Sequence, residues 1–216
     1  MHCIVYGVGS FFMFELSEIL DRAGIGVEAY INNLPDREPP PGISPVYPAT
    51  NMELEWLPLP IVLPWVTPGY RKQLVEETRS LGFTNFPRII DPSSITARSG
   101  SYGEGLIINA GSVIGACCRV SRFVLVNRNA SLGHDVVVED FVSIGPGVNV
   151  GSKCHLKAGA FVGIGATIAP EVTIGRNAIV GAGAVVFKDV ADGSTVVGNP
   201  SRVIKSNGLG FNDFSV

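Results

Sequence analysis

The sequence predicts an α/β unit followed by a parallel β-helix, two architectures within one chain. Composition changes near residue 90: ten of the fifteen prolines lie between Pro35 and Pro68, whereas nineteen of the twenty-six glycines lie at or beyond Gly100. Before that point apolar runs alternate with helical patterns, and after Ile108 an aliphatic residue recurs at every sixth position. Such a change in hydrophobic period indicates a change of architecture.

The first part begins with a strand, a helix and a second strand. CIVY (3–6) is a short apolar run that ends at Gly7. Residues 11–24 then place apolar side chains at helical spacing until Gly24 ends the pattern. VEAYI (27–31) is the second strand.

After a proline-rich loop the same alternation continues. IVLPWV (61–66) predicts a third strand, and Thr67-Pro68 supplies an N-cap and a first-turn proline for a helix through about Leu81. RIID (88–91) predicts a short strand. Alternating strands and helices favour a small parallel sheet.

The second part is a hexapeptide repeat, which is typical of a parallel β-helix. Aliphatic residues would fill the interior, small residues the corners, and glycine the turns. Seven of the fourteen repeat positions are followed directly by glycine. The fourteen positions are all Ile, Leu or Val: Ile108, Ile114, Val120, Val126, Leu132, Val138, Ile144, Val150, Leu156, Val162, Ile168, Ile174, Val180 and Val186.

Three hexads would make one triangular coil of eighteen residues, so residues eighteen apart should stack. Cys118, Val136 and Cys154 fall on one such column. The two cysteines would lie two coils apart, about 9.6 Å, which is too far for a disulfide. We interpret them as small interior residues.

Charge and composition exclude several classes of protein. The net charge of −3 and the absence of a Lys/Arg cluster argue against nucleic-acid binding. No apolar run is long enough for a membrane span, and the first residues do not resemble a signal peptide. The four cysteines lack metal-ligand spacing. A soluble cytoplasmic protein without a metal is therefore expected.

Several motifs together resemble one family. They are GVGSFF (7–12), TPGYRKQLVEETRSLGF (67–83), PRIIDPSSI (87–95), NxxxxxxHD (127–135) and GAGAVVFKDVADGSTVVGNPSRVI (181–204). With the hexads, they make the chain similar to the bacterial sugar acyltransferases of the sialic acid O-acetyltransferase and bacillosamine N-acetyltransferase group. The HD motif and the last segment are the specific parts.

The resemblance implies a left-handed β-helix, a homotrimer, and acetyl-CoA in the groove between neighbouring β-helices. On this basis residues 1–90 form a Rossmann-like nucleotide-sugar-binding domain and residues 91–205 a left-handed β-helix acyltransferase domain. Residues 206–216 form a tail whose sequence shows no interpretable pattern.

His134 and Asp135 are the candidate catalytic pair. An acceptor that attacks a thioester must lose a proton, and histidine, with an ordinary pKa of about 6.5, accepts one at neutral pH. His134 lies two residues past Leu132, at a coil corner, so its ring should point outward. The resemblance assigns His134 as the base and Asp135 as its partner; on spacing alone, an exposed corner histidine without a role is the alternative.

Further site residues come from the resemblance. Ser152, preceded by Gly151, lies one coil above His134, and its backbone N–H would stabilise the thioester oxyanion. Asn127 matches a polar active-site position. Both could equally be ordinary corner residues.

One departure from the family concerns Ser143. Many relatives have a second histidine nine residues after the first, whereas Ser143 stands here. A hydroxyl can hold water or substrate but is no base at neutral pH, so the proton relay or the acceptor could differ. His155 is interpreted as a surface histidine.

The first loop also departs from a dinucleotide-binding site. Phe12 stands where the third glycine of the fingerprint is needed, and Asn32 follows the second strand where an acidic residue would hold a ribose. An NAD site is therefore not expected. Following the relatives, Gly7, Gly9, Ser10 and Asn32 are candidates for binding a nucleotide sugar, although Phe11 and Phe12 could alter or close the pocket. A tight strand-to-helix turn is the alternative.

For CoA, the resemblance points to backbone groups of the upper coils. The candidates are Ile164, Gly165, Ala182 and Gly183. Lys188 could meet a phosphate or simply be solvated.

The sequence thus predicts an acetyl-CoA-dependent transferase that N-acetylates a nucleotide-activated amino sugar for surface glycan synthesis. The alternatives are O-acetylation of a sugar or sialic acid, a zinc hydrolyase of the γ-carbonic anhydrase kind, and a non-catalytic binding or assembly protein. A zinc site would need three histidines, and only His134 and His155 lie in the repeat. The sugar, the nucleotide and the acyl chain length are not determined.

Overall fold

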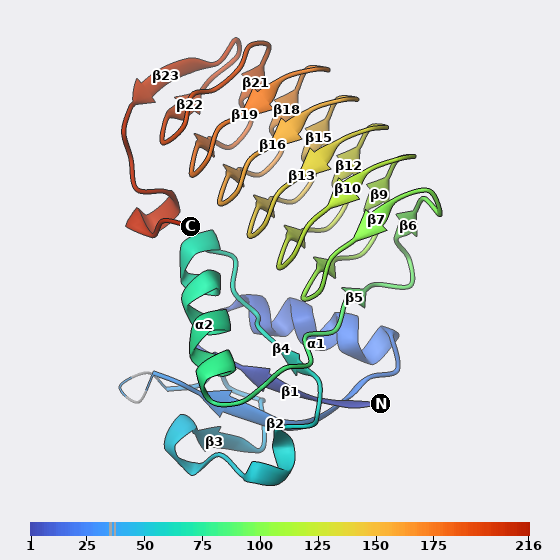
Figure 1. The fold of residues 1–216 in the computed structure, drawn as a ribbon, viewed down its shortest axis with the longest axis vertical. Helices are drawn as coiled ribbons and strands as arrows, with labels where there is room; N and C mark the ends of the chain where they lie inside the picture. Colours follow the sequence, from blue (N-terminus) through green and yellow to red (C-terminus); the bar gives the residue numbers. More distant parts are fainter. Residues whose placement is uncertain (35, 37) are drawn as a thin grey trace.

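The computed structural model describes residues 1–34, 36 and 38–216. The first part contains a four-stranded parallel sheet in the order β3-β2-β1-β4 (Figure 1). Its elements are β1 (His2–Tyr6), α1 (Phe12–Arg22), β2 (Gly26–Asn32), β3 (Val46–Pro48), the short 3₁₀ turns η1 (Ala49–Asn51) and η2 (Leu54–Trp56), β4 (Ile61–Val62) and α2 (Pro68–Ser80). The strands and helices expected from the sequence are all present, and β3 is an additional strand inside the proline-rich loop.

Side chains of β1 alternate between the two faces of this sheet, as its two-residue period requires. Cys3 and Val5 belong to the apolar cluster that contains α1, whereas Ile4 and Tyr6 belong to the cluster that contains Leu74 of α2. The helices therefore cover opposite faces of the sheet. Among the described residues, no helix is long and apolar enough to cross a membrane.

The second part is a β-helix with three faces, and each face is a sheet of parallel strands apart from the last strand, β23 (Figure 1). The eight-stranded face contains β5 (Ile89–Ile90), β8 (Ile107–Ile108), β11 (Leu125–Val126), β14 (Ser143–Ile144), β17 (Phe161–Val162), β20 (Ile179–Val180), β22 (Thr195–Val197) and the antiparallel β23 (Arg202–Lys205). The six-stranded face contains β6 (Ile95–Thr96), β9 (Val113–Ile114), β12 (Ser131–Leu132), β15 (Asn149–Val150), β18 (Thr167–Ile168) and β21 (Val185–Val186). The five-stranded face contains β7 (Ser101–Tyr102), β10 (Arg119–Val120), β13 (Val137–Val138), β16 (His155–Leu156) and β19 (Thr173–Ile174).

The eighteen-residue coil is confirmed by the strand register. Arg119 pairs with Val137, which pairs with His155, and the other faces repeat this spacing. All fourteen aliphatic positions of the repeat are buried. Cys118, Val136 and Cys154 are also fully buried, and both cysteines are free thiols, as interior residues should be.

The β-helix begins one coil earlier than the hexad count indicated. β5, which contains the RIID segment, pairs with β8 of the β-helix and not with the first sheet. The hexad positions of this first coil are Ile90, Thr96 and Tyr102. Thr96 and Tyr102 break the aliphatic pattern, so counting Ile, Leu and Val alone could not find the coil.

The two parts are joined by packing and by ion pairs. Ile107 and Leu125 of the eight-stranded face pack in the same apolar cluster as α1. Arg22 of α1 donates to the fully buried Asp91 carboxylate at 2.7 Å. Burial would raise the pKa of Asp91, but hydrogen bonds from Ser93 and Arg22 lower it overall. The carboxylate thus stays ionised and holds α1 to the first coil.

The three corners of the β-helix are named here by one residue each. The Asn127 corner (127–130, 145–148, 163–166 and 181–184) joins the eight- and six-stranded faces. The His134 corner (133–136 and 151–154, with their stacked equivalents) joins the six- and five-stranded faces. The Phe141 corner (121–124, 139–142, 157–160 and 175–178) joins the five- and eight-stranded faces and lies toward α2.

We predict that Leu156→Ala lowers the free energy of unfolding by about 2–5 kcal/mol, because the closed interior cannot collapse around the lost volume. Arg119→Ala on the same face, where the side chain is exposed, should change it by less than about 0.5 kcal/mol. Urea unfolding at a fixed protein concentration measures both. Equal losses would contradict the assignment of Leu156 to the interior.

Candidate functional site

His134 and Asp135 form a hydrogen-bonded pair on the surface of their corner. The distance from His134 Nδ1 to Asp135 Oδ2 is 2.7 Å, and the side chains are 56% and 51% exposed. Asp135 has a φ of 59°, which turns the chain at the corner. With Nδ1 held by the carboxylate, Nε2 is the ring nitrogen available to a ligand. The outward orientation expected for His134 is present.

Ser152 lies directly above His134 in the next coil. The backbone N–H of Lys153 donates to the His134 carbonyl at 2.9 Å, which fixes this stacking. A Cβ at Gly133 would lie 2.7 Å from the Ser152 nitrogen, so only glycine permits the two turns to approach this closely. Within the described residues the Ser152 N–H donates to no acceptor. It is therefore available to a carbonyl oxygen, and Gly151 stands beside it.

Asn127 lies on a different corner, across the six-stranded face from His134. Its side chain is 7% exposed, and its Oδ1 accepts hydrogen bonds from Asn109 Nδ2 at 3.1 Å and from the Arg128 backbone at 2.8 Å. These bonds account for Asn127 as a corner residue. A contact with a substrate stays a prediction.

Ser143 is not the exposed substitute for a second histidine. It is 1% exposed, and its hydroxyl accepts from both terminal nitrogens of Arg71 at 3.1 Å while donating to the Val66 carbonyl. Ser143 thus links α2 to the β-helix. In this arrangement the Ser143 hydroxyl is occupied by these hydrogen bonds, so its catalytic role stays a prediction.

Arg71 of α2 is a buried cation between the two parts of the chain. Its side chain is 2% exposed and donates to the carbonyls of Phe123 and Phe141 at 2.9 Å each, among other main-chain carbonyls. Burial lowers the pKa of the guanidinium to about 9, so it remains charged at neutral pH. No carboxylate among the described residues pairs with it, so main-chain dipoles compensate the charge.

The first loop borders an open pocket of about 720 Å³, which we call the N-terminal pocket. Gly9 and Ser10 line it, whereas Gly7 and Asn32 are not among its lining residues. Gly7 has a φ of 89° and accepts a hydrogen bond from the Trp65 indole, and Asn32 Oδ1 accepts from the Leu34 backbone at 3.0 Å. These two positions therefore have a structural explanation as turn residues.

Phe11 and Phe12 do not close the N-terminal pocket. Both rings line the pocket, Phe12 as a largely buried member of the apolar cluster of α1 and Phe11 with 83% of its side chain exposed. The rest of the lining includes Pro39–Pro41, Trp65 and Val66, which the sequence did not indicate as pocket residues. A proline-rich loop gives no periodic signal from which such a lining could be inferred.

A smaller cavity of about 250 Å³, the corner pocket, lies where the first part meets the Asn127 corner. Val66 lines both pockets, so they are neighbours. Asn127, Ser143, Phe161 and Ile164 are also among the residues that line the corner pocket. Its lining is largely apolar and closed on one side by the buried Arg71–Ser143 contact.

The candidate CoA residues lie higher on the Asn127 corner, except for Lys188. Ile164 is 63% exposed, and its carbonyl accepts from the Gly183 backbone at 2.8 Å, so Ile164, Gly165, Ala182 and Gly183 form two stacked turns. Lys188 is exposed and lies two residues past the inward Val186, on the His134 corner. That position is three coils, roughly 14 Å, above His134.

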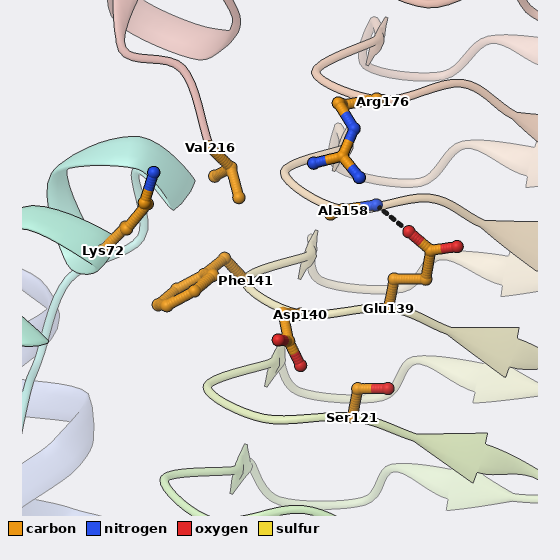
Figure 2. Close-up of a pocket in the computed structure, with 8 residues that line it drawn as sticks. All are labelled: Lys72, Ser121, Glu139, Asp140, Phe141, Ala158, Arg176 and Val216. Atoms are coloured by element: carbon orange, nitrogen blue, oxygen red, sulfur yellow. Dashed lines mark hydrogen bonds between the residues drawn. The ribbon is translucent and has the colours of Figure 1, made fainter.

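His155 forms another histidine–carboxylate pair, on the five-stranded face. Its Nε2 lies 2.7 Å from Glu139 Oε1, and Glu139 also accepts from the Ala158 backbone at 2.9 Å. Figure 2 shows Glu139 in a cavity of about 420 Å³ between α2 and the Phe141 corner. Among the described residues, no three His, Cys, Asp or Glu side chains are grouped to hold a metal ion.

Comparison with known proteins places this geometry in context. The bacterial transferase hexapeptide (six repeats) family matches residues 153–188. A comparison with curated protein sequences gives no match. The acetyltransferase domain of PglB from Neisseria gonorrhoeae FA1090 has a TM-score of 0.83 at 26% identity, covering 94% of this chain and 99% of that domain.

Two further solved structures are similar over their whole length. GDP-perosamine N-acetyltransferase from Caulobacter crescentus, solved as a histidine-to-alanine variant with CoA and GDP-perosamine, has a TM-score of 0.84 at 27% identity, covering 95% and 98% of the two chains. WeeI from Acinetobacter baumannii AYE shares the fold, with a TM-score of 0.78 at 24% identity and coverages of 94% and 100%.

These matches confirm the left-handed β-helix behind a small α/β unit and the resemblance to bacterial sugar acyltransferases. The fold and the matched hexapeptide repeats indicate an acyltransferase. Two of the three similar structures are acetyltransferases by name, and one of them holds both CoA and a nucleotide sugar.

We predict that Arg71→Met lowers the free energy of unfolding by more than about 4 kcal/mol, because it leaves several buried carbonyls and the Ser143 hydroxyl without a donor. Lys72→Ala, on the same helix, breaks an exposed ion pair with Glu76 and should cost less than about 1 kcal/mol. Denaturant unfolding at one protein concentration compares them. A small loss for Arg71→Met would show that the carbonyls find other donors.

Proposed function

We propose that this protein transfers the acetyl group of acetyl-CoA to the amine of a nucleotide-activated amino sugar, for surface glycan synthesis. The observation that carries the proposal is the exposed His134–Asp135 pair with the free Ser152 N–H one coil above it. A base and an oxyanion donor one coil apart, about 4.8 Å, suit acyl transfer. Similarity to an N-acetyltransferase solved with CoA and GDP-perosamine supports the choice of substrates.

In the proposed reaction, His134 Nε2 accepts a proton as the acceptor nitrogen bonds to the thioester carbonyl carbon. Asp135 stabilises the imidazolium through Nδ1. The negative charge on the carbonyl oxygen is stabilised by the Ser152 N–H. The carbon–sulfur bond then breaks, and the CoA thiolate leaves with the proton that the imidazolium returns.

The proposed substrates would occupy the two adjoining pockets. The nucleotide would bind in the N-terminal pocket beside Gly9, Ser10 and Phe11, where the exposed ring offers a stacking surface. The sugar would extend past Val66 into the corner pocket. Residues 1–90 would thus act as the nucleotide-sugar domain and 91–205 as the acyltransferase domain.

We infer that the site is completed by a neighbouring copy, in a homotrimer. His134 and Ser152 lie on one corner, whereas the corner pocket and the candidate CoA turns lie on another, so one chain cannot bring all of them to one ligand. The six-stranded face between these corners carries no charged outward residue, and two of its apolar side chains, Ile95 and Val113, are 64% and 41% exposed. Its outward residues are Ile95, Val113, Ser131, Asn149, Thr167 and Val185.

The reaction is tested by following CoA release from acetyl-CoA in the presence of different acceptors. The panel pairs nucleotide-linked 4-amino and 3-amino sugars with free sialic acid and neutral hydroxyl sugars. Loss of thioester absorbance is the preferred signal, because a thiol reagent would also react with the exposed Cys117. Turnover with one amino sugar would establish N-acetylation, and turnover with only hydroxyl acceptors would establish O-acetylation. Absence of CoA binding would favour a non-catalytic scaffold.

The cytoplasmic location of the protein stays a prediction.

We predict that His134→Ala slows turnover by about 10²–10⁴-fold and leaves CoA binding nearly unchanged, because the base contributes to proton removal and not to cofactor affinity. His155→Ala is the matched control, since the His155 side chain on the five-stranded face pairs with Glu139 at the Phe141 corner and should not be needed for activity. Steady-state kinetics and calorimetric CoA titration measure both effects. Full activity in His134→Ala would assign proton removal to the substrate itself.

A further inference from the structure

Residues 206–216, whose sequence gave no pattern, fold back along the β-helix to reach α2 (Figure 1). The backbone N–H of Gly208 donates to the Gly193 carbonyl at 2.8 Å near the last coil. Lower down, the Val216 N–H donates to Asn177 Oδ1 at 3.0 Å. A Cβ at Gly159 would lie 2.7 Å from Val216 Cβ, so this coil has no room for a side chain there. The segment therefore follows the Phe141 corner closely.

The same segment also contacts the beginning of α2. Asn212 Nδ2 donates to Thr67 Oγ1 at 3.1 Å. A Cβ at Gly69 would lie 2.6 Å from the Phe214 carbonyl carbon, so the segment packs against a helix surface that only glycine leaves free. The ring of Phe214 meets Tyr70 edge to face at 5.4 Å. Segment 206–216 thus joins the first part of the chain to the β-helix.

One ring of the segment forms a stack beside the corner pocket. Phe211 and Phe161 are nearly parallel, with an interplanar angle of 4° and ring centroids 3.7 Å apart. Phe161 lines the corner pocket together with Val66 and Ser143. Phe211 therefore supports the back of a ring that forms one wall of that pocket.

A second set of aromatic contacts extends toward the N-terminal pocket. Phe214 contacts Tyr70, and Tyr70 packs on Trp65 with ring centroids 4.4 Å apart. Trp65 lines the N-terminal pocket, and its indole donates to the Gly7 carbonyl. Both pockets thus have a wall residue that is held, directly or through one ring, by segment 206–216.

We propose that segment 206–216 is a determinant of acceptor binding, with Phe211 as the positioning residue for the Phe161 wall of the corner pocket. The segment makes no hydrogen bond with His134 or Ser152, and of the candidate CoA residues Ile164 lines the corner pocket whereas Gly165, Ala182 and Gly183 do not. Loosening the segment should therefore weaken acceptor binding more than acetyl-CoA binding. The substrate named in this inference rests on the proposed function, whereas the site itself rests on the observed ring contacts.

The kinetic test uses Phe211→Ala in the full-length chain. A stacked aromatic pair contributes an amount equivalent to about a two- to tenfold change in affinity. We expect the KM for the nucleotide sugar to rise by about that factor, with a clearly smaller change in the KM for acetyl-CoA. Phe211→Tyr, which keeps the ring, should restore the wild-type value. Leu209→Ala, in the same segment and 60% exposed, is the matched control.

The outcomes separate a positioning role from a merely structural one. A lower melting temperature with unchanged KM values, or an equal rise in both KM values, would overturn the proposal. A second readout does not need turnover: hydrogen exchange at 143–146 and 161–164 should become faster in Phe211→Ala, while 133–136 on the His134 corner stays as in the wild type. Unchanged exchange around the corner pocket would also overturn it. If wild-type protein transfers acetyl to no acceptor, the proposed function fails, and the exchange result alone decides the role of Phe211.

Discussion

The constraint on which the rest of the structure depends is the eighteen-residue register of the coils. Each strand offers one side chain to a narrow interior, which beyond the first coil is filled by aliphatic and small residues, so a shift of one residue would expose the core. The register therefore fixes every corner residue as well. It places Ser152 over His134 and, by the same rule, keeps Asn127 on a different corner. The division of the candidate site between two corners follows from the repeat itself, and a symmetrical neighbour is the simplest way to bring the corners together.

A second feature of the structure is the contact between Arg71 and Ser143. At the position where the family resemblance led us to expect a second histidine, Ser143 is buried and receives two hydrogen bonds from Arg71. The fixed positive charge behind the corner pocket cannot act as a base, but it anchors α2, and with it Val66, at the boundary of both pockets. Position 143 thus serves the geometry of the pocket, and the proposed proton removal is assigned to His134 alone. In the proposed reaction, the nearby guanidinium would also disfavour the protonated form of an acceptor amine, and the attack needs the neutral form.

The His134–Asp135 and His155–Glu139 pairs, two of the three histidine–carboxylate pairs among the described residues, show why contact geometry alone does not identify a catalytic pair. Their distances are the same, 2.7 Å, yet their surroundings differ. Glu139 also accepts a backbone N–H, and His155 lies on a flat face of the β-helix, so that pair braces two coils. The His134 pair lies at a corner beneath an unused backbone donor, which gives it a second group to act with.

The sequence by itself determined the β-helix, its interior residues, and the outward position of His134, because a strict six-residue period leaves one solution for which side chains point inward. It also predicted the strands and helices of the first part from local patterns. The tertiary structure alone decided the rest. The first coil of the β-helix could not be recognised in the sequence because Thr96 and Tyr102 replace aliphatic residues there. The Arg71–Ser143 contact joins residues seventy-two positions apart, and the Phe211–Phe161 stack depends on a return path of the chain that no local pattern encodes. Contacts of this kind depend on packing between segments that are distant in the sequence, and a periodic pattern of residues does not predict such packing.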